Sequence, residues 1–433
     1  MRVLLISPNR LRLVVPPLPL GLAGVAASLV AEHEVEVLDF MFLEDPLAEL
    51  ERLLEAFRPE IIGVSVRNID NQASRHPESY FEEIKDLVAE LRERTPAPII
   101  LGGAGFSVMP REFMEFAMPD FGLAGEGEGA MGAFLSAYAA GRQIWDRVPG
   151  LLWREDGAVR TNPPHRVPDL ARLPAPALEY FTPRLYEQAL GSAKLPGMIP
   201  VQSRRGCPMK CIYCTTPRLE GDVLRARDPE RVAGWLADWH AKWGLTRFYF
   251  VDNMFNCPAD YARRLCRAIQ DLGLPLDWAC LINPAYPDPE LLHLIRAAGG
   301  TMAQVGNESG SELVLTNLGK GFTRKQVEAT LSQLSQEGLA YTCFLLLGGP
   351  GETPETVQES VALLERYQPR MVNLTVGIRI HPGLPIHRLA LEERVVSPKD
   401  NLLLPHFYLA AAVKDWIWGF VEELTARHPN WIL

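Results

Sequence analysis

Short apolar runs and amphipathic segments alternate along the first 143 residues of this chain. Runs of a few mostly β-branched residues are typical of buried strands, and the longer segments between them place apolar residues at helical spacing. Five such strand–helix units predict an α/β domain with a doubly wound, Rossmann-like parallel sheet that binds ligands at the carboxyl ends of its strands. The expected strands are Val3–Ser7, Val35–Leu38, Ile61–Val66, Ile99–Gly102 and Asp120–Leu123. The expected helices cover about 21–31, 47–57, 78–94, 111–116 and 129–139.

A second alternating array begins near Ile199. Six further strand–helix units predict a partial (β/α)6 barrel, whose chemistry should lie at the carboxyl ends of the strands. Prolines and a threonine mark where the helices begin, because these residues are favoured at helix starts. The expected strands are Ile199–Ser203, Arg247–Asp252, Asp277–Leu281, Met302–Gly306, Tyr341–Leu347 and Met371–Ile378. The helix-start signals are Pro229, Pro258, Pro289, Thr323 and Pro354.

The pattern weakens in two places, which divide the chain into four predicted segments. Prolines accumulate between residues 144 and 195, as expected of a linker, and a hairpin is predicted at Leu151–Arg160 around Asp156-Gly157. After residue 385 we expect a short helical C-terminal region with an aromatic helix around Phe407–Phe420. The predicted domains are therefore 1–143, a linker at 144–195, the partial barrel at 196–385 and a helical cap at 386–433.

Composition and charge limit the cellular compartments and the classes of binding partner to expect for this chain. The net charge of −10 makes nucleic acid a poor partner. Seven cysteines, three of them within eight residues, indicate reduced thiols and one metal site rather than a disulfide framework. The start MRVLLISPN lacks the features of a signal peptide, and no apolar stretch approaches the ~20 residues of a membrane helix. We expect a cytoplasmic protein with no membrane span and no nucleic-acid partner.

The strongest chemical motif is the segment from Arg204 to Cys214, which follows the first strand of the second array. Cys207, Cys211 and Cys214 have the spacing C-x3-C-x2-C, which suits three thiolates around an iron–sulfur cube with one iron left open. A small molecule can coordinate at that open iron. The other interpretations are a zinc site, which would normally use a fourth Cys or His nearby, and incidental buried cysteines.

This motif resembles that of the radical S-adenosylmethionine (SAM) superfamily, with Tyr213 as the aromatic residue before the last cysteine. The resemblance implies a [4Fe–4S] cluster and SAM as cofactors, a 5′-deoxyadenosyl radical, and an electron donor such as flavodoxin or ferredoxin. At the ends of later strands, Asp252 and Asn253 match positions that bind the methionyl amine, and Glu308 matches a position that binds the ribose. Gly348 begins a loop that resembles one passing near adenine.

Each of these later matches has a plain alternative. The alternative for Glu308 is a solvated loop carboxylate, and the alternative for the glycine loop is an ordinary turn before a helix. Cys257, Cys266, Cys280 and Cys343 lie in or beside apolar segments and are expected to be inert. Among these four, Cys280 and Cys343, near strand ends, are the candidates for hydrogen-atom donors.

The N-terminal domain resembles the cobalamin-binding subgroup of the same superfamily. The segments that carry this resemblance are 16–22, 102–107 and 125–129. It implies that cobalamin lies against Gly102, Gly103, Gly125 and Glu126, since glycines allow a large flat ligand to approach the backbone. The alternative for the Gly125–Gly129 segment is simple helix capping.

One departure concerns the lower face of the cobalt. Many cobalamin proteins carry Asp-x-His-x-x-Gly, whose histidine ligates cobalt, but the segment Ser65–Asn71 after the third strand contains no histidine. Either cobalamin binds without a protein ligand, with Arg67 or its neighbours beneath the cobalt, or the domain has lost cobalamin. The alternative for Arg67 is a surface ion pair.

Three hypotheses follow for function, and no catalytic residue is assigned. The first is a cobalamin-dependent methyltransferase that acts on an unactivated carbon or phosphorus of a small metabolite. The second is a radical SAM enzyme without methyl transfer, such as a dehydratase, epimerase, cyclase or rearrangement enzyme. The third is a corrinoid carrier or iron–sulfur scaffold without enzymatic activity.

Overall fold

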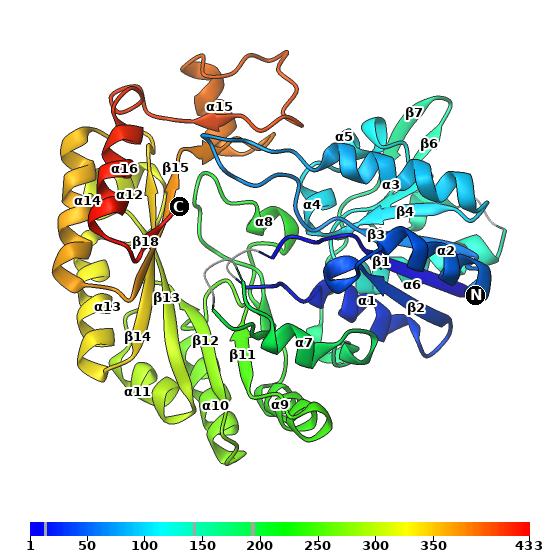
Figure 1. Cartoon of the computed structure of the whole chain (residues 1–433), viewed down its shortest axis with the longest axis horizontal. Helices are drawn as coiled ribbons and strands as arrows, with labels where there is room; N and C mark the ends of the chain where they lie inside the picture. Colours follow the sequence, from blue (N-terminus) through cyan, green and yellow to red (C-terminus); the bar gives the residue numbers. More distant parts are fainter. Residues whose placement is uncertain (13–14, 142–143, 192–194) are drawn as a thin grey trace. The chain divides into compact units, whose positions relative to one another are not determined.

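The computed structural model describes residues 1–12, 15–141, 144–191 and 195–433, and this chain divides into two compact units (Figure 1). Unit 1 comprises Met1–Asn71, Glu78–Ile199 and Arg218–Gly221, and unit 2 comprises Gln72–Pro77, Pro200–Pro217 and Asp222–Leu433. The last residues of the predicted N-terminal domain, 142–143, and of the predicted linker, 192–194, lie outside the described residues. The predicted domain boundaries stay a prediction.

In the described part of unit 1, seven strands form one sheet in the order β2-β1-β3-β4-β5-β6-β7. The first five strands pair in parallel, as predicted, and the predicted hairpin adds two antiparallel strands at the edge. Residues of β1, β3 and β4 are almost entirely buried, which is why these strands read as continuous apolar runs. The strands are β1 (Arg2–Ser7), β2 (Glu34–Asp39), β3 (Ile61–Ser65), β4 (Ile99–Gly102), β5 (Phe121–Leu123), β6 (Leu151–Glu155) and β7 (Ala158–Thr161).

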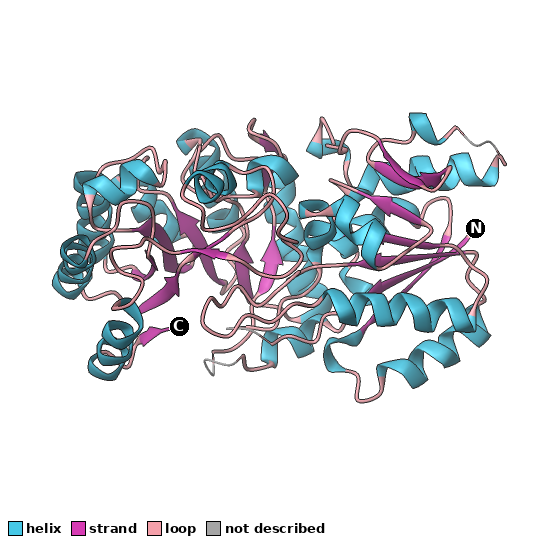
Figure 2. Ribbon diagram, turned by 90° about the horizontal axis from the view of Figure 1, so that it is seen from above, coloured by secondary structure: helices cyan, strands magenta, loops and turns pink. Residues whose placement is uncertain are grey.

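Helices cover both faces of this sheet (Figure 2), as the doubly wound prediction requires. Helix α1 packs against α6, and α3 packs against α5. The proline-rich segment after β7 contributes only short helices. The helices are α1 (Leu20–Leu29), α2 (Pro46–Phe57), α3 (Phe81–Arg94), α4 (Gly103–Val108), α5 (Pro110–Phe116), α6 (Gly127–Ala139) and α7 (Pro183–Gln188). Four 3-10 turns lie at Phe40–Phe42, Trp145–Arg147, Leu170–Arg172 and Leu178–Tyr180 among the described residues.

In the described part of unit 2, another seven strands form a sheet in the order β18-β15-β14-β13-β12-β11-β8. Each pair from β11 through β18 is parallel, which matches the predicted open barrel. The last strand, β18, was not predicted and extends the sheet beyond the six expected strands. The strands are β8 (Ile199–Val201), β11 (Arg247–Phe250), β12 (Asp277–Ile282), β13 (Gly300–Glu308), β14 (Ala340–Leu347), β15 (Met371–Val376) and β18 (Trp431–Ile432).

Most helices of unit 2 begin where the sequence signals placed them. Of the predicted start signals, Thr323 is itself a side-chain cap, while Pro229, Pro289 and Pro354 occupy the first position of their helices. The residues before these prolines, Asp228, Asp288 and Thr353, each accept a hydrogen bond from the first turn of the helix that follows. The helices are α8 (Thr216–Leu219), α9 (Pro229–Trp243), α10 (Ala259–Asp271), α11 (Pro289–Ala297), α12 (Glu312–Asn317), α13 (Arg324–Glu337), α14 (Pro354–Tyr367), α15 (Pro385–Glu392) and α16 (Ile417–Arg427).

The predicted aromatic helix at Phe407–Phe420 is wrong. Phe407–Tyr408 form strand β17, which pairs antiparallel with β16 (Ile378–Arg379), and the helix begins only at Ile417. Strand pairing with a distant segment supplies the backbone partners of Phe407 and Tyr408, so tertiary context overrides the local pattern. A similar two-stranded ribbon joins β9 (Arg204–Arg205) to β10 (Arg225–Ala226) at the start of the cysteine segment. Across the described residues, we find no helix long and apolar enough to span a membrane.

Candidate functional site

The three cysteines of the C-x3-C-x2-C motif lie on one loop between β9 and α8 of unit 2. Cys207 is buried, Cys211 and Cys214 are half-buried, and none of the three forms a disulfide. Burial raises the pKa of the Cys211 thiol to about 11, and Lys320 partly opposes this shift. A metal that coordinates such a thiol supplies the positive charge that stabilises the thiolate. Three thiols clustered on one loop therefore fit the ligation of an iron–sulfur cluster.

No three His, Cys, Asp or Glu side chains converge tightly enough to hold a single metal ion within residues 1–12, 15–141, 144–191 and 195–433. The assignment of Cys207, Cys211 and Cys214 as cluster ligands stays a prediction, which rests on their spacing and their common loop.

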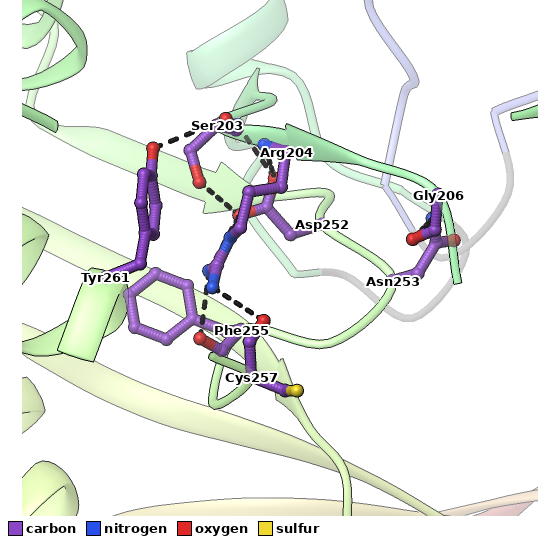
Figure 3. Close-up of polar contacts among 8 residues, drawn as sticks. All are labelled: Ser203, Arg204, Gly206, Asp252, Asn253, Phe255, Cys257 and Tyr261. Carbon is purple, nitrogen blue, oxygen red and sulfur yellow. Dashed lines mark hydrogen bonds and ion pairs between the residues drawn. The ribbon is translucent and has the colours of Figure 1, made fainter. Parts of the chain in front are cut away.

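A buried ion pair fixes the chain just before Cys207 (Figure 3). The Asp252 carboxylate and the Arg204 guanidinium lie 3.1 Å apart, and their side chains are 1% and 2% exposed. Oδ1 of Asp252 accepts hydrogen bonds from the backbone N–H groups of Ser203 (2.7 Å) and Arg204 (2.9 Å). Oδ2 accepts from the Ser203 hydroxyl and from Nε and Nη2 of Arg204. The chain itself thus occupies both oxygens that the sequence suggested for the methionyl amine.

Arg204 also ties the loop after β11 to this ion pair. Its guanidinium donates to the backbone oxygens of Phe255 (2.8 Å) and Cys257 (2.9 Å) and stacks 4.5 Å from the centre of the Tyr261 ring (Figure 3). Arg204 lies within the predicted cysteine motif, but its place in the sequence does not indicate a role. The contacts show that it sets the geometry of the chain three residues before Cys207.

Asn253, the second candidate after β11, lies next to the cysteine loop. Its Nδ2 donates to the backbone oxygen of Gly206, and its Oδ1 accepts from the Thr216 hydroxyl, both at 3.4 Å. These contacts place Asn253 between the backbone just before Cys207 and the start of α8.

Glu308 and Tyr213 are brought together with Lys320, a residue that sequence analysis missed. Glu308 ends β13 with a φ of +60°, an uncommon conformation for a residue other than glycine and often a mark of a functional position. The Lys320 ammonium lies 3.5 Å from a Glu308 carboxylate oxygen and 3.3 Å from the Tyr213 hydroxyl. Burial raises the pKa of Tyr213 well above its ordinary value, with Glu308, Cys211 and Cys214 adding to the shift. Glu308, Tyr213 and Lys320 thus form one polar cluster, in which Glu308 and Tyr213 were predicted as site residues.

The loop that Gly348 begins is organised by Glu352. One carboxylate oxygen of Glu352 accepts hydrogen bonds from the N–H groups of Gly348 and Gly349, the latter at 3.0 Å. Its other oxygen, Oε1, has no hydrogen-bond partner within the described part of the chain. Burial raises the pKa of Glu352 to about 7, although the two backbone hydrogen bonds oppose the shift. Glu352 therefore shapes the predicted adenine loop, and sequence analysis gave it no role.

The predicted cobalamin residues lie at the carboxyl ends of β3, β4 and β5 in unit 1. A side chain at Gly103 would meet the Val66 backbone oxygen at 2.6 Å, and one at Gly125 would collide with the His165 backbone. Intrachain packing thus explains both glycines, whereas Gly102 has room for a side chain beside the chain itself. The Glu126 carboxylate accepts a hydrogen bond from the N–H of Val167 at 2.6 Å. Of this set, Gly102 fits a ligand-facing position best, and cobalamin contact stays a prediction for all of them.

Arg67 is exposed and donates to Asn68 at 3.0 Å, but it forms no ion pair with any carboxylate of the described residues. This does not support the interpretation of Arg67 as a surface ion-pair residue. A partly buried pair that no motif indicated lies in the same unit: the Tyr186 hydroxyl donates to the Asp39 carboxylate at 2.6 Å. Burial raises the pKa of Asp39, and the hydrogen bond from Tyr186 opposes the shift. Tyr186 comes from the proline-rich segment, where no motif pointed to it.

The burial of the remaining cysteines contradicts the expectation that Cys280 and Cys343 are hydrogen-atom donors. Cys280 and Cys343 are fully buried, as is Cys266, so neither proposed hydrogen-atom donor reaches a substrate without movement of the chain. Cys257 is half-buried, and its thiol hydrogen-bonds to the Tyr286 phenol near Cys207. Among these four described cysteines, Cys257 is the better candidate for chemistry near the cysteine loop.

Family comparisons match both units. Residues 201–364 match the Radical SAM superfamily, and residues 11–135 match the B12 binding domain. The chain is 26% identical to a tryptophan 2-C-methyltransferase of Streptomyces laurentii over 90% of this chain and 74% of that protein. It is also 26% identical to a cytidylyl-2-hydroxyethylphosphonate methyltransferase of Streptomyces wedmorensis over 89% of this chain and 80% of that protein.

The fold is similar to that of a solved radical S-adenosylmethionine methyltransferase, TsrM from Kitasatospora setae, with tryptophan substrate and a SAM analogue bound. The TM-score is 0.85 at 22% identity, over 99% of this chain and 90% of that one. At this identity the likeness establishes the fold, and the two matched families establish which domains the chain contains.

Proposed function

The chain contains a radical SAM domain preceded by a B12-binding domain, and we propose that it is a cobalamin-dependent methyltransferase. Its substrate would be a small metabolite that is methylated on an unactivated carbon or on phosphorus. The observation that carries this proposal is the group of three thiols on one loop beside Glu308, in a chain that also contains a B12-binding domain. Two relatives that align with both domains are named as methyltransferases of carbon and of a phosphonate.

The residues of unit 2 would bind and orient the first two cofactors. When bound, a [4Fe–4S] cluster and SAM supply a 5′-deoxyadenosyl radical, and cobalamin supplies the methyl group. Cys207, Cys211 and Cys214 would hold the cluster by three irons, and Asn253 and Glu308 would contact the methionyl amine and the ribose. We revise the role of Asp252: its oxygens are engaged by Ser203 and Arg204, so it would position the cluster loop.

The residues of unit 1 would receive cobalamin at the carboxyl ends of the parallel strands, where such sheets bind ligands. Arg67 would lie beneath the cobalt, since Ser65–Asn71 contains no histidine and the Arg67 guanidinium has no carboxylate partner among the described residues. Gly102 would face the ligand, and Gly103, Gly125 and Glu126 would shape the loops around it.

The physiological setting belongs to the same proposal. All seven cysteines lie within the described residues and form no disulfide there, which suits a reducing compartment such as the cytoplasm. The cluster would be reduced there by a donor such as flavodoxin or ferredoxin. Reduced flavodoxin should therefore support turnover in place of a chemical reductant.

A radical reaction without methyl transfer is the second candidate, because a relative supports it. The chain is 24% identical to an anaerobic magnesium-protoporphyrin IX monomethyl ester cyclase of Rubrivivax gelatinosus over 82% of this chain and 63% of that protein. The product mass separates the candidates. Tryptophan and cytidylyl-2-hydroxyethylphosphonate, incubated with the reduced holoenzyme and methyl-deuterated SAM, test two substrates of the relatives.

A product heavier by one labelled methyl group supports the methyltransferase. A product changed without the label supports the second candidate and contradicts the first. Protein in which all three loop cysteines are alanine serves as the control and should form neither product.

A further inference from the structure

The sequence Gly319-Lys320-Gly321 forms a loop that packs directly on the cysteine loop. The N–H of Ile212 donates to the Leu318 backbone oxygen at 3.0 Å. Gly319 and Gly321 both have a φ of +68°, and a side chain at Gly319 would stand 2.7 Å from the backbone oxygen of Lys210. Both glycines are therefore required by their backbone conformation, and the residue between them is held against the cysteine loop.

The side chain of Lys320 points into this contact rather than to solvent. It is 8% exposed, and its ammonium lies 3.5 Å from the Glu308 carboxylate and 3.3 Å from the Tyr213 hydroxyl. The rings of Phe322 and Tyr213 lie 5.5 Å and 5.8 Å from the ammonium. Burying an ammonium costs free energy unless it is paired, so a leucine or methionine would fill this place more cheaply if packing alone mattered.

Packing alone therefore does not explain a lysine at this position, whereas its ion pair with Glu308 does. Glu308 has a left-handed backbone conformation at the end of β13, where the strand register also shifts. Such a conformation persists only where surrounding contacts hold it. Two contacts tie the Glu308 carboxylate to the cysteine loop. One is its hydrogen bond with Tyr213, which lies on that loop. The other is the ion pair with Lys320, whose loop packs on the cysteine loop through Gly319 against Lys210.

We propose that Lys320 is a positioning residue for SAM, which holds the Glu308 carboxylate where it accepts hydrogen bonds from the ribose hydroxyls. This inference rests on the proposed function, in which Glu308 is the ribose acceptor. It adds a residue that no motif assigned, and it links the ribose contact mechanically to the loop that holds the cluster.

The test measures SAM binding to the anaerobic holoprotein by isothermal titration calorimetry, with iron and sulfide content determined on each sample. Lys320→Met should keep its cluster and bind SAM about 10- to 100-fold more weakly, the range expected for a lost hydrogen bond to a charged group. Lys320→Arg should restore most of the affinity, because it keeps the charge. Lys325→Met is the matched control, since Lys325 is exposed at the start of α13, and its affinity should be unchanged.

The Glu308→Gln background decides whether Lys320 acts through Glu308. There, adding Lys320→Met should change the dissociation constant by less than about threefold, because the carboxylate that Lys320 holds is already gone. If Lys320→Met does not assemble its cluster, Lys320→Gln, which can still donate a hydrogen bond, replaces it. Lys320→Gln is then measured in the wild-type protein and in Glu308→Gln, and it should weaken SAM binding only in the protein that keeps Glu308.

Two results overturn the inference alone: wild-type affinity in Lys320→Met, or an equal loss of affinity with and without the Glu308 carboxylate. Wild-type protein that assembles no cluster or binds no SAM overturns the proposed function, and this inference with it.

Discussion

Replacement of Asp252 by asparagine separates a positioning role from a role in binding SAM. Within the described residues, the carboxylate accepts five hydrogen bonds, two on Oδ1 and three on Oδ2. Asparagine replaces one acceptor oxygen with an NH₂ group that faces donors from Ser203 or Arg204. It also removes the counter-charge of the Arg204 guanidinium, whose side chain is 2% exposed. The substitution therefore leaves a buried cation without its anion.

The magnitude follows from this burial. Removing one partner of a buried ion pair typically costs about 3–5 kcal/mol, because the other charge stays buried without compensation. For a domain of this size, each kcal/mol lowers the midpoint of thermal unfolding by roughly 2–4 °C, so a decrease of about 6–20 °C is expected. Because Arg204 and Ser203 immediately precede the cysteine loop, cluster assembly should fall together with stability.

The assay combines anaerobic thermal unfolding with iron and sulfide determination. The control is Asp288→Asn, whose ion pair with Arg263 (2.5 Å) lies at the cap of α11 and does not involve Ser203 or Arg204. The Asp288 side chain is 15% exposed, so its loss should cost less, about 1–2 kcal/mol, and leave the cluster content unchanged. The contrast between the two variants isolates the effect on the loop.

One result would refute this reasoning. If Asp252→Asn unfolds at the wild-type temperature and carries a full cluster but binds no SAM, then its carboxylate binds the cofactor directly. The sequence-based interpretation of Asp252 as a methionyl-amine ligand would then stand, and the ion pair with Arg204 would have no positioning role.

Three further predictions follow from the site. Replacing Cys207, Cys211 and Cys214 together by alanine should abolish cluster absorbance after anaerobic reconstitution, and retained iron–sulfur content would contradict the ligand assignment. Glu352 has a folded-state pKa near 7 against an ordinary value of 4.5, so the folded state binds more protons between these values and stability should fall as pH rises through this window. Between pH 5.5 and 8 the loss should be about 2 kcal/mol, and Glu352→Gln should remove it in denaturant unfolding at the two pH values; an unchanged dependence would place its source elsewhere. Arg67→Ala should cost less than about 0.5 kcal/mol of stability, because Arg67 is exposed, and yet change the absorption spectrum of bound cobalamin; an identical spectrum would remove Arg67 from the cobalt site.

The fold could be predicted from sequence because its signals are local. Strands buried on both faces have continuous apolar sequences, and signals such as Pro229 and Pro354 mark helix starts within a few residues. Strand β18 was missed because two residues, Trp431–Ile432, carry no periodicity and are defined only by pairing with Val372 and Asn373. The hairpin after β5 was found because Asp156-Gly157 is a local turn signal.

Sequence alone predicts which residues of the site stand at the ends of successive strands, and no more. Spacing places Asp252 and Glu308 at such ends, but it does not tell which donors point at each carboxylate. Arg204 pairs with Asp252 and lies 48 residues from it in the sequence. Lys320 pairs with Glu308 and lies 12 residues from it. The glycines on both sides of Lys320 were a usable signal, since paired glycines around a cation indicate a tight loop.

The most direct test of the methyltransferase claim needs no substrate. Holoprotein loaded with cobalamin is reduced anaerobically and mixed with SAM whose methyl group carries ¹³C, and the corrinoid is then extracted and weighed by mass spectrometry. The account predicts labelled methyl in the corrinoid fraction, with an equal amount of S-adenosylhomocysteine. Protein that binds both cofactors but leaves the corrinoid unlabelled, with no S-adenosylhomocysteine formed, would contradict it.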